Sequence, residues 1–97
     1  MESLSILSLN CQGLGDLNKR KDVFNYLHSK KYNIVCLQDT HFTTSQEDNI
    51  ETLWGYRCYF SSFASNSRGV SILFKNNFEF TVHREKRDVG GNYLILV

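Results

Sequence analysis

The sequence predicts an α/β fold, with strands and helices alternating along a chain of 97 residues. Residues 34–37 (IVCL) form a short, unbroken apolar run of the kind found in strands buried on both faces. Residues 19–31 place apolar side chains on one face at helical spacing. Residues 4–9 (LSILSL) mix apolar residues with serine, which predicts a strand before this helix.

Length and composition limit the class of protein. The chain is long enough for one domain at most, and its 41% hydrophobic content indicates a packed core. The formal net charge of +1 gives no global field toward nucleic acid, so any such contact needs a local patch. No apolar run approaches the ~18–20 residues of a membrane span, so we expect no membrane partner.

The three cysteines, Cys11, Cys36 and Cys58, are widely spaced and contain no C-x-x-C pair. This pattern argues against a disulfide framework or a zinc site. Cys36 lies inside the apolar run and is predicted to be a small core residue. Free thiols favour a reducing compartment, so we expect the protein in the nucleus or cytoplasm.

The order strand, helix, strand predicts a βαβ crossover with two parallel, neighbouring strands. Asn18 is the expected N-cap of the helix. The first strand runs into Asn10 and the second into Asp39. Because the carboxyl ends of parallel strands meet at one edge of a sheet, we expect Asn10 and Asp39 to lie side by side there.

The second half of the chain predicts one short helix and several strands. Ser45 and Asp48 resemble a capping box, and the helix that follows ends at Gly55. Further strands are expected at residues 56–60, 69–74, 78–82 and 93–97, with a polar loop at 61–68 and turns at 76–77 and 88–92. Because the last strand is apolar and uncapped, we expect residues 1–97 to be the N-terminal portion of a single larger domain.

Four motifs then suggest a family. Residues 8–14 (SLNCQGL) and 37–41 (LQDTH) resemble the endonuclease/exonuclease/phosphatase superfamily, whose strands end in N-x-x-G-L and L-Q-E-T. Residues 68–74 (RGVSILF) and 86–93 (KRDVGGNY) look most like the endonuclease domains of non-LTR (LINE-type) retrotransposons. The resemblance covers essentially the whole chain, and the four motifs occur in the family's order and at similar spacing.

This resemblance implies the N-terminal part of a four-layered α/β sandwich (α+β class) like those of apurinic endonucleases and deoxyribonucleases. It implies a Mg²⁺-dependent phosphodiester hydrolase, with Mn²⁺ as an alternative metal, that nicks DNA. The implied partners are DNA, the missing C-terminal part of the domain and a downstream reverse transcriptase domain.

The resemblance also assigns candidate site residues. Asn10 and Asp39 match the family's first two metal-site positions and are the predicted catalytic and metal-binding residues. Gln12 and Gln38 match positions beside these ligands. Without the resemblance, Asn10 and Gln12 are turn residues and Asp39 is a helix cap. One carboxylate and one amide oxygen suit Mg²⁺, which prefers oxygen ligands and keeps several waters.

Other polar residues have two interpretations each. His41 and Arg68 are candidates for phosphate contacts, or else a locally bonded histidine and a surface arginine. The basic residues 19–21 and 30–31 are candidates for DNA contacts, although a solvated helix face is the simpler interpretation. Three large aromatic side chains are assigned to the core rather than to base stacking: Phe42, Trp54 and Phe60.

The chain departs from the family pattern at two points. Asp39 stands where the family usually has Glu, and it is shorter by one carbon–carbon bond of ~1.5 Å. Productive sites tolerate only ~0.5 Å of misplacement, so a backbone shift or a bridging water must make up the difference. The family's later motifs, N-x-Y-x-P, G-D-x-N and S-D-H, do not occur in these 97 residues.

Three functional hypotheses follow. The first is the nicking endonuclease of a LINE-type retrotransposon. The second is a catalytically inactive retrotransposon-derived fragment that binds a partner through its sheet. The third is a repair endonuclease or phosphoesterase branch of the same superfamily. Residues 68–74 and 86–93 favour the retrotransposon branch over the third.

We expect the 97-residue chain alone to nick plasmid DNA at no useful rate, because the family's water-orienting and general-base motifs are absent from it. A supercoiled-plasmid assay in Mg²⁺ checks this. Metal-dependent turnover of the plasmid by the purified chain would refute it.

Overall fold

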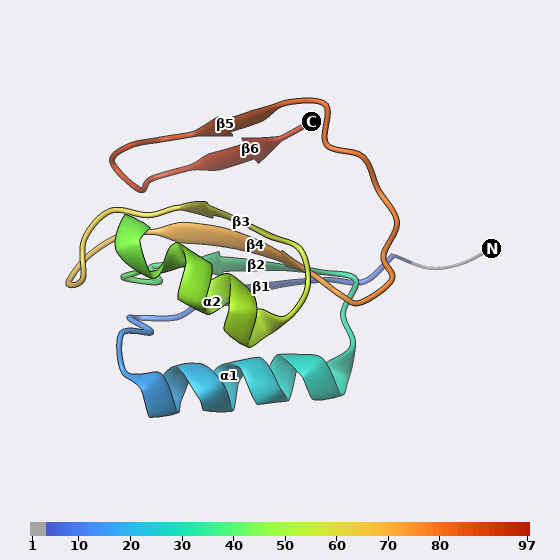
Figure 1. Ribbon diagram of the computed structural model, residues 1–97, viewed down its shortest axis with the longest axis horizontal. Coiled ribbons are helices and arrows are strands. Elements are labelled where there is room, and N and C mark those ends of the chain that lie inside the picture. Colours follow the sequence, from blue (N-terminus) through green and yellow to red (C-terminus); the bar gives the residue numbers. More distant parts are fainter. Residues whose placement is uncertain (1–3) are drawn as a thin grey trace.

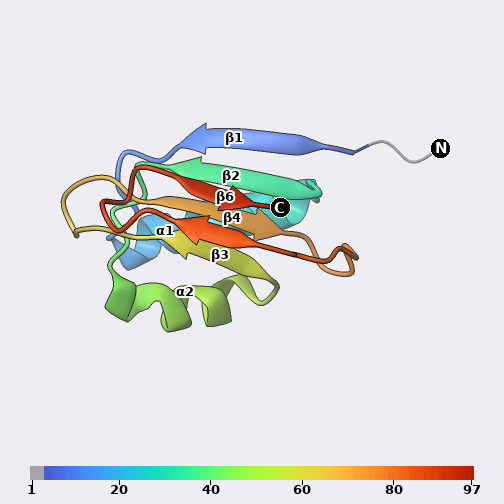
Figure 2. The same cartoon turned by 90° about the horizontal axis from the view of Figure 1, so that it is seen from above.

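A computed structural model describes residues 4–97. Its elements are β1 (Ile6–Asn10), α1 (Leu17–Lys30), β2 (Ile34–Gln38), a 3₁₀ turn η1 (Thr44–Gln46), α2 (Glu47–Trp54), β3 (Cys58–Ser61), β4 (Val70–Phe74), β5 (Glu85–Arg87) and β6 (Leu94–Leu96). The first four strands form one sheet in the order β1-β2-β4-β3, and β5 and β6 form a separate hairpin. Figure 1 shows the hairpin over one face of the sheet and α1 against the other, with α2 toward the β3 edge in Figure 2.

The predicted βαβ unit is confirmed. β1 and β2 are parallel neighbours, with a register that runs from Ile6 opposite Ile34 to Asn10 opposite Gln38. β4 then pairs antiparallel with β2 and with β3. The order places the carboxyl ends of β1 and β2 and the beginning of β4 at the same end of the sheet, at the left of Figure 1.

Helix α1 begins earlier than predicted. Asp16 is its N-cap, and the Asp16 carboxylate accepts a hydrogen bond of 2.9 Å from the backbone N–H of Lys19. The prediction of Asn18 as the cap is therefore wrong, because Asn18 already lies inside the helix. An aspartate carboxylate is an equally good acceptor for the orphan N–H groups of a first turn.

The core lies between the sheet and the helices. Alternate residues of β1 and β2 point into it, so Val35 and Leu37 are buried against Phe24 and Leu27 of α1. The predicted core aromatics Phe42, Trp54 and Phe60 are confirmed as buried: they belong to this cluster.

The prediction that the second strand is buried on both faces is only half right. Ile34 and Cys36 lie on the face toward the hairpin and are only partly buried. They line an apolar groove of about 370 Å³ between the sheet and the hairpin, together with Ile72 and Leu96. Two short hairpin strands are too narrow to cover this face, so Cys36 is not a full core residue.

The start of α2 also differs from its prediction. The backbone N–H of Thr43 donates to Gln46 Oε1 at 3.1 Å, so the reciprocal cap joins Thr43 and Gln46 rather than Ser45 and Asp48. Glutamine at the third position is long enough to reach back to the cap, and aspartate is shorter. The predicted end at Gly55 is confirmed, and Gly55 has a left-handed φ of 90°.

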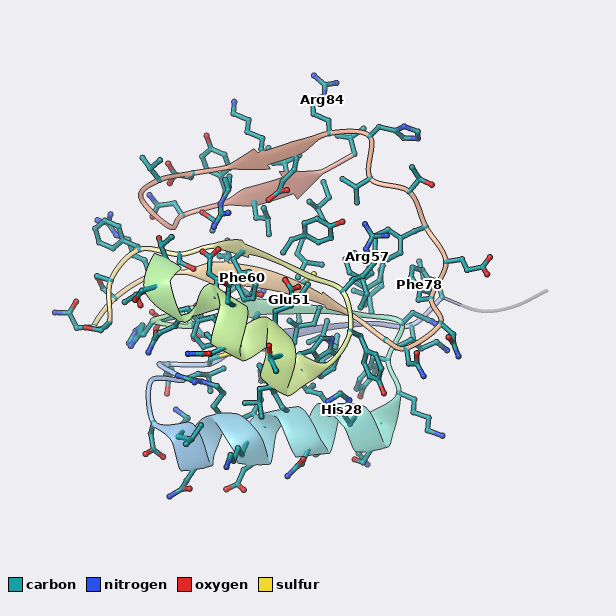
Figure 3. All side chains as sticks on the ribbon, in the orientation of Figure 1. His28, Glu51, Arg57, Phe60, Phe78 and Arg84 are labelled. Atoms are coloured by element: carbon teal, nitrogen blue, oxygen red, sulfur yellow. The ribbon has the colours of Figure 1, made fainter. Side chains whose placement is uncertain are left out.

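The strand predicted at residues 78–82 does not form, although the turn at 76–77 does. The rings of Phe78 and Phe80 stack on Phe74 at centroid distances of 6.0 and 4.0 Å, at the end of β4. Arg57 donates to the carbonyl of Phe80 and lines one pocket together with Phe78; both side chains are labelled in Figure 3. Aromatic packing therefore takes the place of a ladder, and the alternation of apolar residues reflects stacking rather than strand pairing.

The antiparallel hairpin of β5 and β6 confirms the turn predicted at residues 88–92 and most of the last predicted strand. The N–H of Gly91 closes the turn on the carbonyl of Asp88 at 3.0 Å. Among residues 4–97, no helix combines the length and the apolar composition needed to cross a membrane.

The thiol of Cys58 gives a pH prediction. Burial beside Glu51 and Glu47 raises its pKa from 9.0 to about 12. Because the folded pKa is raised, the stability that the neutral thiol contributes is complete below about pH 9 and is lost as the pH rises toward about 12. We therefore expect the stability advantage of the wild type over Cys58→Ala to shrink between about pH 8 and about pH 10.5. Urea unfolding of wild type and Cys58→Ala at the two pH values checks this prediction. A stability difference that does not change with pH would contradict the raised pKa of Cys58.

Candidate functional site

The loops after β1 and β2 continue the pairing of these strands. Three successive backbone hydrogen bonds of 2.8 Å join them, from Cys11 N–H to Gln38 C=O, from Gly13 N–H to Asp39 C=O and from Leu14 N–H to Thr40 C=O. The loops are therefore fixed against each other beyond the sheet, although neither is a strand. This holds the backbone of residue 39 next to that of residues 10–13.

Two further loops join the same end of the sheet. The N–H of His41 donates to the carbonyl of Arg68 at 2.8 Å, and that of Thr40 donates to Gly69 at 3.0 Å. Gly69 in turn donates to the carbonyl of Gly91 at 2.9 Å. All four sequence motifs thus meet at one rim, at the left of Figure 1.

Left-handed backbone conformations are concentrated at this rim. Gln12, Asp39, His41 and Arg68 have φ values of 51°, 53°, 62° and 62°. Each of these non-glycine residues was predicted as a site residue from the sequence. Such conformations cost of order 1–3 kcal/mol each and persist where surrounding contacts enforce them, which is common at functional sites.

Asn10 and Asp39 lie on this rim, at the carboxyl ends of β1 and β2. Asn10 is exposed, sits opposite Gln38 in the ladder, and its Oδ1 accepts a hydrogen bond of 3.2 Å from the backbone N–H of Gln12. The side chain of Asp39 is 40% exposed, and its Oδ1 lies 2.8 Å from His41 Nε2. The structure thus brings the backbones of the two predicted ligands together and leaves both side chains accessible to solvent.

His41 is locally bonded, in agreement with the simpler of its two interpretations. Its ring joins Asp39 and lies over Gly13, where an added Cβ would sit 2.7 Å from Nδ1 of the ring. Gly13 also has a φ of 91°. The close approach of the ring and the backbone conformation both require glycine at this position.

The remaining predicted residues have separate contacts. The Gln38 amide bonds to Ser8 Oγ and to the carbonyl of Cys36, which links β1 and β2 rather than Asn10 and Asp39. Arg68 is exposed, and one guanidinium nitrogen donates to the carbonyl of Gly90 at 3.4 Å.

Sequence reasoning missed the role of Arg20, which was expected on a solvated helix face. Arg20 is only 7% exposed, and its Nε donates to the carbonyl of Leu14 at 3.0 Å. Its guanidinium also lies 5.5 Å from the centre of the Phe42 ring. Burial lowers the pKa of Arg20, and the nearby Asp16 charge opposes that shift. The helical phase of Arg20, four residues before the core residue Phe24, is the signal that could have revealed this.

Lys19 also contacts the rim. Its ammonium donates to the carbonyls of Cys11 and Gln12 at 3.0 and 3.4 Å. Lys19 therefore ties the start of α1 to the loop that follows Asn10. It also brings a positive charge to the rim, consistent with the basic cluster noted in the sequence.

Two pKa shifts describe the electrostatics of the rim. Burial and the Asp39 charge raise the pKa of the Cys11 thiol to about 11, against an opposing effect of Lys19. Cys11 is therefore a neutral thiol at neutral pH, not a thiolate nucleophile. Backbone N–H groups of Asn92 and Gly90 lower the pKa of Asp88, so that it is a carboxylate at neutral pH.

The rim carries oxygen donors of the chemical type that hard cations prefer. Asn10 offers an amide oxygen and Asp39 a carboxylate. Among residues 4–97, no group of three or more His, Cys, Asp and Glu side chains is arranged to hold a metal ion. A cation held here would keep most of its waters, which is usual for Mg²⁺ and unusual for structural zinc.

A mixed sheet with helices on one face and strand-end loops carrying polar residues defines an α+β domain with its site on the rim. The family model described as "Endonuclease/Exonuclease/phosphatase family" matches residues 7–95, and the chain belongs to this family. Membership makes it a nuclease- or phosphodiesterase-type domain and confirms the family identified from the sequence.

A relative agrees with this assignment. The chain is 31% identical over 94 residues to the "Transposon TX1 uncharacterized 149 kDa protein" of Xenopus laevis. The alignment covers 97% of this chain and 7% of that protein, so the chain corresponds to a small part of this relative.

The contact between Gly13 and His41 gives a second prediction. Gly13→Ala should lower the free energy of unfolding by about 1–3 kcal/mol, because the new methyl group meets the His41 ring and the residue has a left-handed φ. Gly15→Ala is the matched control in the same loop, since nothing lies within 4 Å of its Cβ position. Urea unfolding of both variants checks the prediction, and equal stabilities would contradict the packing described above.

Proposed function

We propose that this chain is part of a metal-dependent phosphodiester hydrolase domain that nicks DNA. The observation that carries the proposal is the meeting of the ends of β1 and β2, with Asn10 and Asp39, on a rim fixed by backbone hydrogen bonds. The local conformational strain at this rim supports it, because strained loops require a reason to persist.

Asn10 and Asp39 would hold Mg²⁺, with Mn²⁺ as an alternative. Mg²⁺ held there would supply Lewis-acid chemistry, polarising a phosphate oxygen and offsetting charge on the leaving oxygen. His41 orients the Asp39 carboxylate through one of its oxygens. Lys19 and Arg20 fix the loop that follows Asn10, and this precise placement is what a productive site needs.

The substrate is DNA and the biological setting is a retrotransposon of the LINE type. The relative carries the name of a transposon, which supports this branch over a repair enzyme or a lipid phosphoesterase. In this setting the nick exposes a 3′-hydroxyl on which a reverse transcriptase can prime. The remainder of the nuclease domain and a reverse transcriptase domain are the proposed partners within a longer protein.

Mg²⁺ binding to the 97-residue chain tests the proposed metal site without requiring activity. Adding Mg²⁺ to a concentration about a hundredfold above its Kd should stabilise the fold by about 2.7 kcal/mol, because the ligand binds only the native state. Thermal unfolding with increasing MgCl₂ measures this as a rise in Tm. Asp39→Asn should remove most of the rise.

Asp22→Asn is the matched control. Asp22 lies on the exposed face of α1, and its substitution removes the same charge as Asp39→Asn. It should keep the full Mg²⁺ effect. A Tm that does not respond to millimolar Mg²⁺, or that rises equally in both variants, would overturn the proposed site.

A further inference from the structure

An exposed aromatic ring stands on the rim beside the candidate site. Phe63 lies in the loop between β3 and β4 and remains 43% exposed. The guanidinium of Arg68, from the other end of the same loop, lies 4.6 Å from the centre of its ring. A phenylalanine this exposed gains less from folding than a buried one, and its ring is accessible to another molecule.

The backbone under this ring is firmly placed. The N–H of Phe63 donates to the carbonyl of the buried Phe42 at 3.2 Å. On its other side, a Cβ on Gly91 would lie 2.5 Å from the Cβ of Phe63, so only glycine fits there. The ring is thus presented by a loop packed between two other segments.

Arg68 joins this ring to the site. Its carbonyl accepts the N–H of His41, the residue that bonds to Asp39. Its side chain covers Phe63 and donates to Gly90. These contacts tie the pair to the segment that carries the proposed metal ligand.

We propose that Phe63 and Arg68 form a nucleotide platform that binds an unpaired or unstacked nucleotide next to the cleavage position. The Phe63 ring stacks on the base, and the Arg68 guanidinium binds the adjoining phosphate. These are the two chemistries a nucleotide presents, a flat aromatic surface and a negative charge. The proposal rests on the proposed function and deepens it, because the platform selects DNA whose bases are locally open.

Binding of short fluorescein-labelled oligonucleotides, followed by anisotropy in low salt and EDTA, tests the platform without metal or cleavage. We expect single-stranded DNA to bind more tightly than a duplex of the same sequence. Phe63→Leu should weaken binding of the single strand about tenfold, within the range of one lost base–aromatic stack. Phe63→Tyr should retain binding, because it keeps the ring.

The chain supplies a matched control for the stacking pair. Tyr26 on α1 is 52% exposed, and the ammonium of Lys30 lies 5.4 Å from the centre of its ring. This pair resembles Phe63 and Arg68 but lies on a helix outside the rim. Tyr26→Leu should leave affinity unchanged. Circular dichroism melting of each variant separates lost binding from lost folding.

The outcomes of this oligonucleotide-binding experiment can be told apart from those of the Mg²⁺ melting experiment. Loss of single-strand binding in Phe63→Leu alone supports the platform, whether or not Asp39→Asn changes the response to Mg²⁺. Equal binding by wild type and Phe63→Leu, or equal losses in Phe63→Leu and Tyr26→Leu, would overturn it. Equal weakening of single strand and duplex by Phe63→Leu would also overturn it, because stacking requires an available base.

Discussion

The pairing of β1 with β2 does not end with the strands, and the candidate site depends on that fact. A parallel ladder normally stops where the chains diverge, and polar loop residues then lose their fixed positions. Here three more backbone hydrogen bonds hold residues 11–14 against residues 38–40. This extension fixes the backbones of the two loops relative to each other in the same way as neighbouring strands of a sheet are fixed.

Holding loops in this way requires conformations that most residues avoid. Four non-glycine residues at the rim are left-handed, and Gly13 and Gly69 occupy places where a Cβ would meet His41 or Thr40. The surrounding core compensates for this strain. Arg20 is the clearest example of such a compensating contact. This charged residue is buried, and its guanidinium donates to the carbonyls of Leu14 and Gly15 in the loop.

The sequence was most informative where local pattern and tertiary structure coincide. The apolar run of β2 and the helical spacing of α1 predicted the βαβ unit, and the parallel pairing of β1 and β2 follows from that unit. It failed where a side chain had a tertiary partner that no local rule encodes. Phe78 and Phe80 follow the alternation of a strand but stack on Phe74. Arg20 has the sequence context of a solvated residue, but its guanidinium binds the carbonyl of Leu14. Phe63 could not be singled out because its partners, Phe42 and Gly91, are distant in sequence.

The backbone of Asp39 gives a physical account of the departure from the family's usual glutamate. The residue has a φ of 53° and directly follows β2. Aspartate tolerates this left-handed conformation better than longer side chains, because its short carboxylate can hydrogen-bond locally. It does so here with His41, itself left-handed and only two residues away. The short side chain of Asp39 and the two left-handed residues are therefore parts of one arrangement, closed by the hydrogen bond between Asp39 and His41.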